Sequence, residues 1–390
     1  MKKRAARYPT GLIDLMQLCT RAIIEKLEDR RLLSSSFTVT DLGVANFTSA
    51  SAYHPLQLMA INNQGQVLVP GANGFLYSDG KTTPLVFLSP KFQKAYALAL
   101  NDLGQIVGTF SGPRMGTQSY GGSFFGLGAG KSSFHLPDAF LYDDKRFIDI
   151  GPGSATSITA SGNTAGISIR WNGSRGTWSA NGAFVYVAGH RHALKLPPHS
   201  PAKDIVAVAI DNAGDVIVAS DHLYLYSTHS RKPVQLSGMQ FSSATMNAAG
   251  EVAGIVSNID NPGTGPAPHA FTVTQAGTID LGPINVLPQY APLVFGINNS
   301  GEVVGDVQIA ATNLSGAVTV SHPLPDHNSY AFVSRNGAIV DLNTLAPPAE
   351  TGWTLQAAEG VNDAGQIVAI GADANGVQHD LLLTPTVGTV

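Results

Sequence analysis

Hydrophobic and polar positions along this chain repeat in one short pattern. An apolar residue is followed by Asn or Asp, two variable residues, Gly, one variable residue and an apolar pair. The pattern begins at Ile61, Leu100, Ile158, Ile210, Met246, Ile297 and Val361. Gly is present in all seven copies and Asn or Asp in six, since the third copy has Thr159. Such recurrence is the signature of a repeat architecture.

Each copy predicts a β-hairpin. An Asn or Asp side chain can bond to its own backbone and open a turn, and Gly three residues later supplies the positive φ of a turn followed by a bulge. A calcium loop would need several acidic ligands per turn, whereas these turns mostly offer Asn. The residue before the apolar position is small in every copy, which indicates strands that crowd together where they meet. These small residues are Ala60, Ala99, Ser157, Ala209, Thr245, Gly296 and Gly360.

A second half-unit follows each hairpin. It consists of a small or polar residue, an aromatic residue within an apolar alternation, a turn and further apolar residues. Examples are residues 138–142 followed by 148–151, and residues 269–273 followed by 279–282. One whole unit therefore holds four short strands, and four-stranded units repeated around a ring are β-propeller blades. We predict an all-β, seven-bladed β-propeller.

The two ends of the repeat region complete one blade. Only one further strand, residues 379–383, follows the seventh hairpin, whereas residues 37–43 match the fourth-strand pattern without a preceding hairpin. We therefore predict that the N-terminal strand closes the last blade and that residues 37–390 form one propeller domain. The chain has 390 residues, and large all-β domains often exceed the average domain length.

The first 36 residues differ from the rest. They carry eight basic and four acidic residues, net +4, whereas the remaining 15 basic and 23 acidic residues give −8. Their apolar residues recur at helical spacing, which predicts a short amphipathic helix outside the propeller. Charges at Asp14, Arg21 and Glu25 interrupt every apolar run, so no transmembrane segment is predicted. An acidic body does not attract phosphate backbones, which disfavours nucleic-acid partners.

Two segments resemble known families. The sequence Leu-Glu-Asp-Arg-Arg-Leu-Leu-Ser at residues 27–34 resembles the N-terminal segment of many large exported proteins of planctomycete bacteria. His269-Ala270-Phe271, with an Ile-Asn-Asn-x-Gly turn and an Asp-Leu-Gly strand as companions, resembles the HAF-repeat family of extracellular bacterial proteins. The literal triplet occurs once. Both resemblances imply an extracellular or cell-surface location, and the HAF repeat brings no catalytic or ligand-binding residues with it.

Long connections are expected between the second and third strands of several blades. They span residues 109–137, 167–181, 255–268 and 306–329, with a shorter one at 370–378, and equivalent connections must emerge on one side of the ring. Trp and Tyr offer flat contact area and Arg offers bidentate donors. Our candidate binding residues are Arg114, Tyr120, Phe124, Lys131, Arg170, Trp171, Arg175 and Trp178. The alternative is that such aromatic residues fold down and cover blade edges.

Signals for enzyme chemistry are weak. Residues 126–132 resemble a phosphate-binding loop but have Phe125 where its first Gly would stand, and there is no nucleophile-elbow pattern. His190 and His192, and likewise the pair Asp143 and Asp144, are interpreted as turn residues. A single Cys excludes a disulfide framework and a Cys-rich metal site. We predict no catalytic residue, no metal ligand and no cofactor.

Two functions stay open. The first is non-catalytic binding of a polysaccharide or a protein partner through the long strand 2–3 connections. The second is a polysaccharide hydrolase or lyase with its site at the central channel. The second would require acidic or His residues that converge at the channel mouth from several blades.

Overall fold

The computed structural model describes most of the repeat region. It covers residues 37–45, 58–71, 74–85, 95–120, 130–143, 146–172, 177–194, 207–219, 222–227, 234–237, 241–256, 269–274, 277–283, 290–309, 329–335 and 337–386. The amphipathic helix and the export segment expected within residues 1–36 lie outside these ranges.

Seven antiparallel four-stranded sheets make up this part of the chain. Blade 1 contains β2 (Ala60–Ile61), β3 (Val67–Val69), β4 (Phe75–Ser78) and β5 (Lys81–Pro84). Blade 2 contains β6 (Ala95–Leu100), β7 (Ile106–Tyr120), β8 (Gly130–Asp143) and β9 (Arg146–Pro152). Blade 3 contains β10 (Ser154–Ile158), β11 (Thr164–Asn172), β12 (Thr177–Val187) and β13 (His190–Leu194). Blade 4 contains β14 (Ala207–Ile210), β15 (Val216–Ala219), β16 (Leu223–Tyr226) and β17 (Val234–Ser237).

The remaining three blades follow the same order. Blade 5 contains β18 (Phe241–Met246), β19 (Val252–Val256), β20 (His269–Thr274) and β21 (Gly277–Pro283). Blade 6 contains β22 (Tyr290–Ile297), β23 (Val303–Ile309), β24 (Tyr330–Arg335) and β25 (Ala338–Asp341). Blade 7 contains β26 (Thr354–Val361), β27 (Ile367–Ala372), β28 (Gln378–Pro385) and β1 (Phe37–Val44). The short helices α2 (Leu342–Leu345) and α3 (Pro348–Thr351) connect blades 6 and 7.

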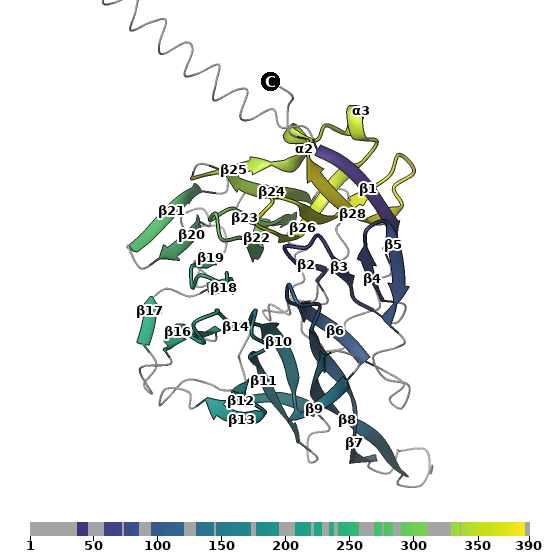
Figure 1. Cartoon of the computed structure of the whole chain (residues 1–390), viewed down its shortest axis with the longest axis vertical. Coiled ribbons are helices and arrows are strands. Elements are labelled where there is room, and N and C mark those ends of the chain that lie inside the picture. The colour runs from purple at the N-terminus through teal and green to yellow at the C-terminus, as the bar shows by residue number, and fades with distance from the viewer. Residues whose placement is uncertain are drawn as a thin grey trace, which may run out of the picture.

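The blades stand in a ring with the first strand of each nearest the axis (Figure 1). This arrangement confirms the predicted all-β, seven-bladed propeller. All seven hairpin glycines have positive φ, between 71° at Gly65 and 87° at Gly250. The Asn side chain also bonds to its own turn as predicted: Asn62 Oδ1 accepts the Gln64 and Gln66 N–H groups at 3.1 and 2.9 Å.

A glycine and a phenylalanine form a recurring cross-strand pair inside the blades. Gly108, Gly166, Gly254 and Gly305 lie opposite Phe140, Phe184, Phe271 and Phe332. A Cβ on Gly305 would lie 1.9 Å from the Leu293 carbonyl oxygen and 2.8 Å from the Phe332 ring. The Phe332 ring and the neighbouring backbone therefore leave no room for a Cβ at Gly305. In blades 1 and 4 the equivalent aromatic residues, Phe75 and Tyr224, lie opposite valines instead.

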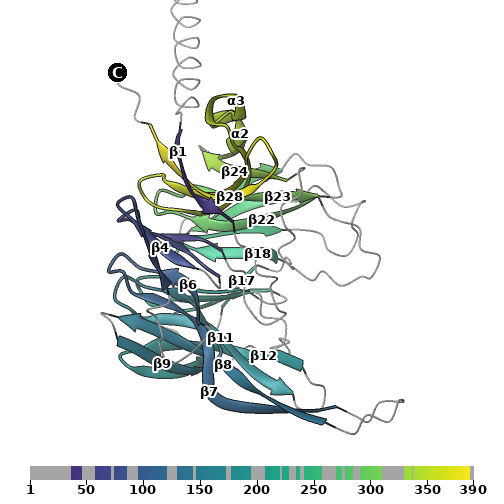
Figure 2. The ribbon, with the colours of Figure 1, turned by 90° about the vertical axis from the view of Figure 1, so that its right-hand side faces the viewer.

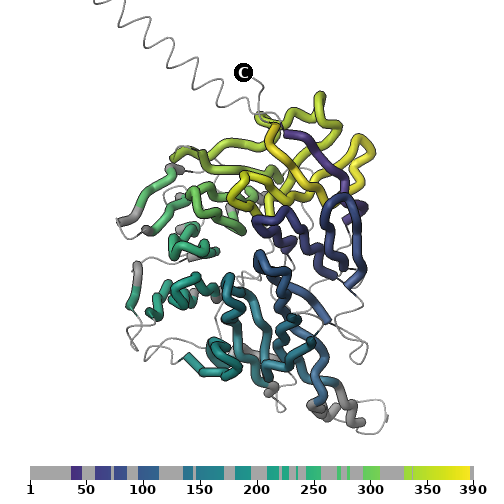
Figure 3. Tube along the Cα trace, viewed as in Figure 1, coloured from purple at the N-terminus to yellow at the C-terminus, as the bar shows by residue number. Residues whose placement is uncertain are grey.

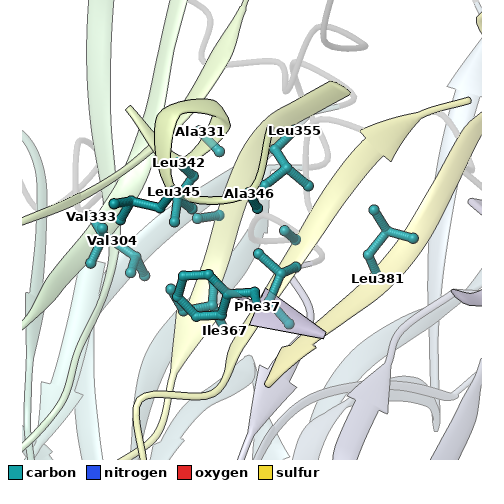
Figure 4. Packing of buried hydrophobic residues seen from close by; sticks show 13 residues of the cluster. Phe37, Val304, Ala331, Val333, Leu342, Leu345, Ala346, Leu355, Ile367 and Leu381 are labelled. Carbon is teal, nitrogen blue, oxygen red and sulfur yellow. The ribbon is translucent and has the colours of Figure 1, made fainter. Parts of the chain in front are cut away.

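The ring closes through the N-terminal strand. β1 pairs with β28 from Phe37 opposite Pro385 to Val44 opposite His379. The tube in Figure 3 shows the purple first strand running beside the yellow last strand. Phe37 is buried with Val333, Leu342 and Leu345, so β1 also reaches into the contact with blade 6 (Figure 4). The predicted closure of the last blade is confirmed.

Two of the predicted long connections are largely strand. β7 and β8 continue their ladder to Tyr120 opposite Gly130, and β11 and β12 continue theirs to Asn172 opposite Thr177. The outer ends of β7 and β8 project past the other blades (Figure 2). The prediction of loops at 109–137 and 167–181 was therefore wrong for most of their length. The reason is that backbone pairing across the hairpin continues after the neighbouring strands of the sheet have ended.

His190 and His192 were also assigned wrongly to a turn. They belong to β13, which follows a turn formed by Ala188 and Gly189 and pairs with β12. Asp143 is the last residue of β8, and Asp144 lies outside the described residues.

Candidate functional site

A two-stranded projection, which we call the long arm, extends from blade 2. It comprises residues 111–120 of β7 and 130–137 of β8, beyond the last pairs that these strands make with β6 and β9. The His135 ring nitrogen Nδ1 lies 2.8 Å from the Gly112 carbonyl oxygen and joins the two strands. At the base, the Gly153 N–H donates to the Pro137 carbonyl at 3.2 Å. The long arm is therefore anchored to the start of blade 3.

A second projection, the short arm, extends from blade 3. It comprises residues 168–172 of β11 and 177–182 of β12, which pair with each other beyond the ladder to β10 and β13. Arg191 fixes its base. The guanidinium lies 3.6 Å from the centre of the Phe184 ring and donates to Ser168 Oγ at 2.9 Å and to the Pro152 carbonyl at 2.6 Å. This cation–π contact and these hydrogen bonds hold the short arm against blade 2.

The two arms carry most of the predicted binding residues. Arg114 and Tyr120 belong to β7 and Lys131 to β8. Arg170 and Trp171 belong to β11 and Trp178 to β12, where the two tryptophans are direct cross-strand partners. Arg170 is exposed. Phe124 and Arg175 lie outside the described residues. Because both arms connect strands 2 and 3 of adjacent blades, they leave the ring on the same face.

The opposite face carries a ring of hydrogen bonds that the sequence analysis missed. Each hairpin Asn donates its side-chain amide to the backbone carbonyl of the equivalent residue in the next blade, at 2.9–3.0 Å. The bonds run from Asn247 to Asn298, Asn298 to Asn362, Asn362 to Asn62, Asn62 to Asn101 and Asn101 to Thr159. The same amide donates to the side chain four residues later, as from Asn62 to Gln66. We call this set of bonds the amide ring.

The amide ring is interrupted on both sides of blade 4. Thr159 and Asp211 occupy the positions of the two missing amides, and neither side chain has an N–H to donate. Asp211 is buried, and burial raises the pKa of its carboxyl. The Asp215 N–H, which donates to Asp211 Oδ1 at 2.8 Å, lowers that pKa, and the charge of the Asp215 carboxylate raises it. Other bonds join blade 4 to its neighbours at the axis: the Ala160 N–H donates to Asn212 Oδ1 at 2.8 Å, and the Asn212 N–H donates to the Ala248 carbonyl at 3.1 Å.

The residues that follow the amide ring form the channel mouth. They are exposed and partly linked: Asn63 Nδ2 lies 3.2 Å from Asp102 Oδ2 and 3.0 Å from Asp363 Oδ2. The two carboxylate oxygens are thus no farther apart than the sum of these distances. Asp363 also accepts the Asn299 N–H and amide, both at 2.8 Å. Carboxylates of blades 2 and 7 therefore converge at the mouth, as the hydrolase alternative requires.

A cavity of about 230 Å³ lies within this mouth and is lined by the hairpins of all seven blades. Its lining combines apolar side chains such as Leu100, Ile210 and Met246 with the Asn and Asp side chains of the hairpins. The only signal for the amide ring in the sequence was the preference for Asn over Asp at the turn. Asp could open the turn equally well, and only Asn can also donate to the next blade.

Blade 7 holds a pair of buried carboxylates. Asp380 of β28 occupies the position at which other blades have buried alanines, such as Ala139 and Ala331. Burial, followed by the charge of Glu359, raises the pKa of Asp380 to about 7. Glu359 is itself buried and accepts the Met59 N–H at 2.7 Å, which ties blade 7 to blade 1. His379 lowers the pKa of Asp380, and its Nδ1 lies 2.9 Å from Asp41 Oδ1 of β1.

Neither a metal-ligand cluster nor a membrane-spanning helix is found in the described part of the chain. Among those residues, no group of three or more His, Cys, Asp or Glu side chains is placed to hold a metal ion. None of the helices described there is long and apolar enough to cross a membrane.

Similarity to known proteins is found among solved structures. No family model matches the chain, and no curated protein matches it. Among solved structures, it is similar to an oligogalacturonate lyase in complex with manganese, at 10% identity over 90% of this chain and 97% of that one, with a TM-score of 0.45. The β-propeller domain of the Trilobed protease from Pyrococcus furiosus is also similar, with 10% identity and a TM-score of 0.44. The match covers 76% of this chain and 83% of that one.

A third similar structure is a GH74 enzyme from Niastella koreensis. The identity is 11% over 87% of this chain, and the TM-score is 0.49. This chain spans about half (53%) of the length of that enzyme. The propeller neighbours thus include hydrolase and lyase enzymes. At these identities the likeness concerns the fold alone.

Proposed function

We propose that this protein is an extracellular or cell-surface propeller that binds a polysaccharide or a protein partner without catalysing a reaction. The observation that carries the proposal is the pair of arms, which leave adjacent blades on one face and are anchored at their bases by Arg191 and Pro137. The arms carry Arg, Lys, Trp and Tyr, which suit hot spots of recognition. The resemblance of residues 27–34 to an export segment and of the repeats to the HAF family supports the location.

Removal of the long arm tests the proposal. Ser111 and Pro137 are cross-strand partners, so residues 112–136 can be replaced by an Asn-Gly turn without change to the rest of blade 2. Wild type and truncated protein are applied to a glycan array and to an extract of extracellular proteins. We expect wild type to retain a specific ligand and the truncated protein to lose it while it melts at the same temperature. Full retention by the truncated protein would contradict the proposal.

The hydrolase or lyase alternative is favoured by one observation, the approach of Asp102 and Asp363 at the channel mouth. Glycosidases use two carboxylates that flank the scissile bond at separations of about 5–10 Å. In this protein both carboxylates accept hydrogen bonds from the amide of Asn63, which holds them as acceptors. The alternative is tested by incubating the protein with a polysaccharide panel and measuring new reducing ends and unsaturated products. Turnover that Asp102→Asn and Asp363→Asn both abolish would establish it in place of the binding proposal.

A further inference from the structure

Charge is segregated around the ring. No Asp or Glu occurs between Leu103 and Pro137 or between Gly151 and Lys203, although the chain has 27 acidic residues and a net charge of −4. These two stretches contain only basic charges: Arg114, Lys131, Arg170, Arg175, Arg191, Lys195 and Lys203. They include both arms and the whole of blade 3 from β10 to β13. The rest of the chain must then be strongly acidic.

The fold places these stretches side by side. Blades 2 and 3 are neighbours in the ring, and β8 packs near β11. Arg191 is used internally at the base of the short arm, so its charge is partly taken up by the Ile150 and Pro152 carbonyls. Arg114, Lys131 and Arg170 lie on the arms beyond these contacts, and Arg170 is exposed. The arms are thus a basic sector on an acidic molecule, a distribution that attracts anions to one place on the surface.

We infer that the two arms bind an acidic polysaccharide, one whose sugar rings carry carboxylate groups. This inference rests on the proposed function and specifies its ligand. Arg donates in pairs to a carboxylate, and the Trp and Tyr residues of the same strands suit the flat faces of sugar rings. A nucleic acid is the competing polyanion, and preference for it is one outcome of the test.

Binding of the full chain to polygalacturonate tests the inference, with dextran as the neutral polymer and single-stranded DNA as the phosphate polymer. The test variant is Lys131→Glu with Arg170→Glu. The matched control is Lys81→Glu with Arg146→Glu, which alters net charge equally at exposed residues of the strand 3–4 turns, on the opposite face. Circular dichroism is used to check that both variants retain the fold. A third variant, Lys131→Gln with Arg170→Gln, separates loss of attraction from added repulsion.

We expect polygalacturonate to bind and its affinity to fall about tenfold or more as salt rises from about 50 to about 300 mM, because the contacts are ionic. The test variant should bind at least about tenfold more weakly, the Gln variant should lie between, and the control should stay within about twofold. Absence of binding, equal binding of dextran, preference for DNA, or equal loss in the control would each overturn the inference.

The two proposals fail in different ways. Binding of dextran that depends on the long arm but not on Lys131 and Arg170 would leave the proposed function standing and refute the acidic ligand. Binding of polygalacturonate that survives removal of the long arm, and is unaffected by the charge variants, would refute both.

Discussion

The contribution of the N-terminal strand to stability can be measured through Phe37. Its side chain is 6% exposed, packs with the blade 6 and α2 residues of its cluster, and has the Arg335 guanidinium 5.6 Å from the ring centre. Replacement of a buried Phe by Ala costs about 3–5 kcal/mol, and loss of the cation–π contact adds about 0.5–1 kcal/mol. Domains are stable by only about 5–15 kcal/mol, so Phe37→Ala should remove a large share of the free energy of unfolding.

Urea denaturation followed by circular dichroism measures this loss. Val44→Ala is the matched control, because Val44 lies on the same strand and is 64% exposed, so its replacement should change stability by less than about 0.5 kcal/mol. If Phe37→Ala also lowers the denaturant slope, β1 has detached in the native state and less surface is exposed on unfolding. Equal midpoints for Phe37→Ala and Val44→Ala would refute closure by β1 as a source of stability.

Three further changes probe the ring. Asn298→Ala removes the amide that donates to Glu302 and to the Asn362 carbonyl, so the free energy of unfolding should fall by about 2 kcal/mol in urea denaturation; an unchanged value would argue against the amide ring. Asp380 has a raised pKa, so the folded state holds its proton more tightly and wild-type stability should decline from about pH 4 to about pH 7. Asp380→Asn should remove up to about 4 kcal/mol of that decline. The free energy of unfolding of the variant should equal that of wild type near pH 4 and exceed it near pH 8, and parallel curves of stability against pH would contradict a raised pKa for Asp380. Gly305→Ala should cost at least about 2 kcal/mol by chemical denaturation, because the new methyl group meets a backbone carbonyl; a neutral result would mean that the strands can separate freely.

Local chemistry explains why the sequence predicted the turns and the number of blades. The bonds from Asn62 Oδ1 to its own turn and the positive φ of Gly65 concern residues at most four apart. The amide ring could not be predicted in the same way, because Asn62 Nδ2 meets a carbonyl 39 residues away. The extent of the long arm escaped prediction because a glycine such as Gly116 has weak β propensity, and its place in the strand depends on pairing with Phe134 of the opposite strand.

The site could be predicted only in outline. The strand 2–3 connections pointed to one face, and the Arg and Trp residues on them were evident. Arg191 was not recognised as an anchor, because its partners Pro152 and Ser168 belong to other strands and lie far from it in sequence. Asp380 could not be recognised as buried, since an Asp beside His379 in a strand pattern is ordinarily exposed.

The first and last strands lie in register, with Phe37 opposite Pro385, so the two chain ends of the propeller are neighbours. A short linker from Pro385 to Phe37 could therefore turn the fold into a covalently continuous circle. New ends could then be placed between blades 3 and 4, where Thr159 has no side-chain amide to donate to the next blade. In such a circular permutant every blade would be built from one continuous stretch of chain, and closure of the ring would depend on the contacts between blades 3 and 4 in place of the pairing of β1 with β28.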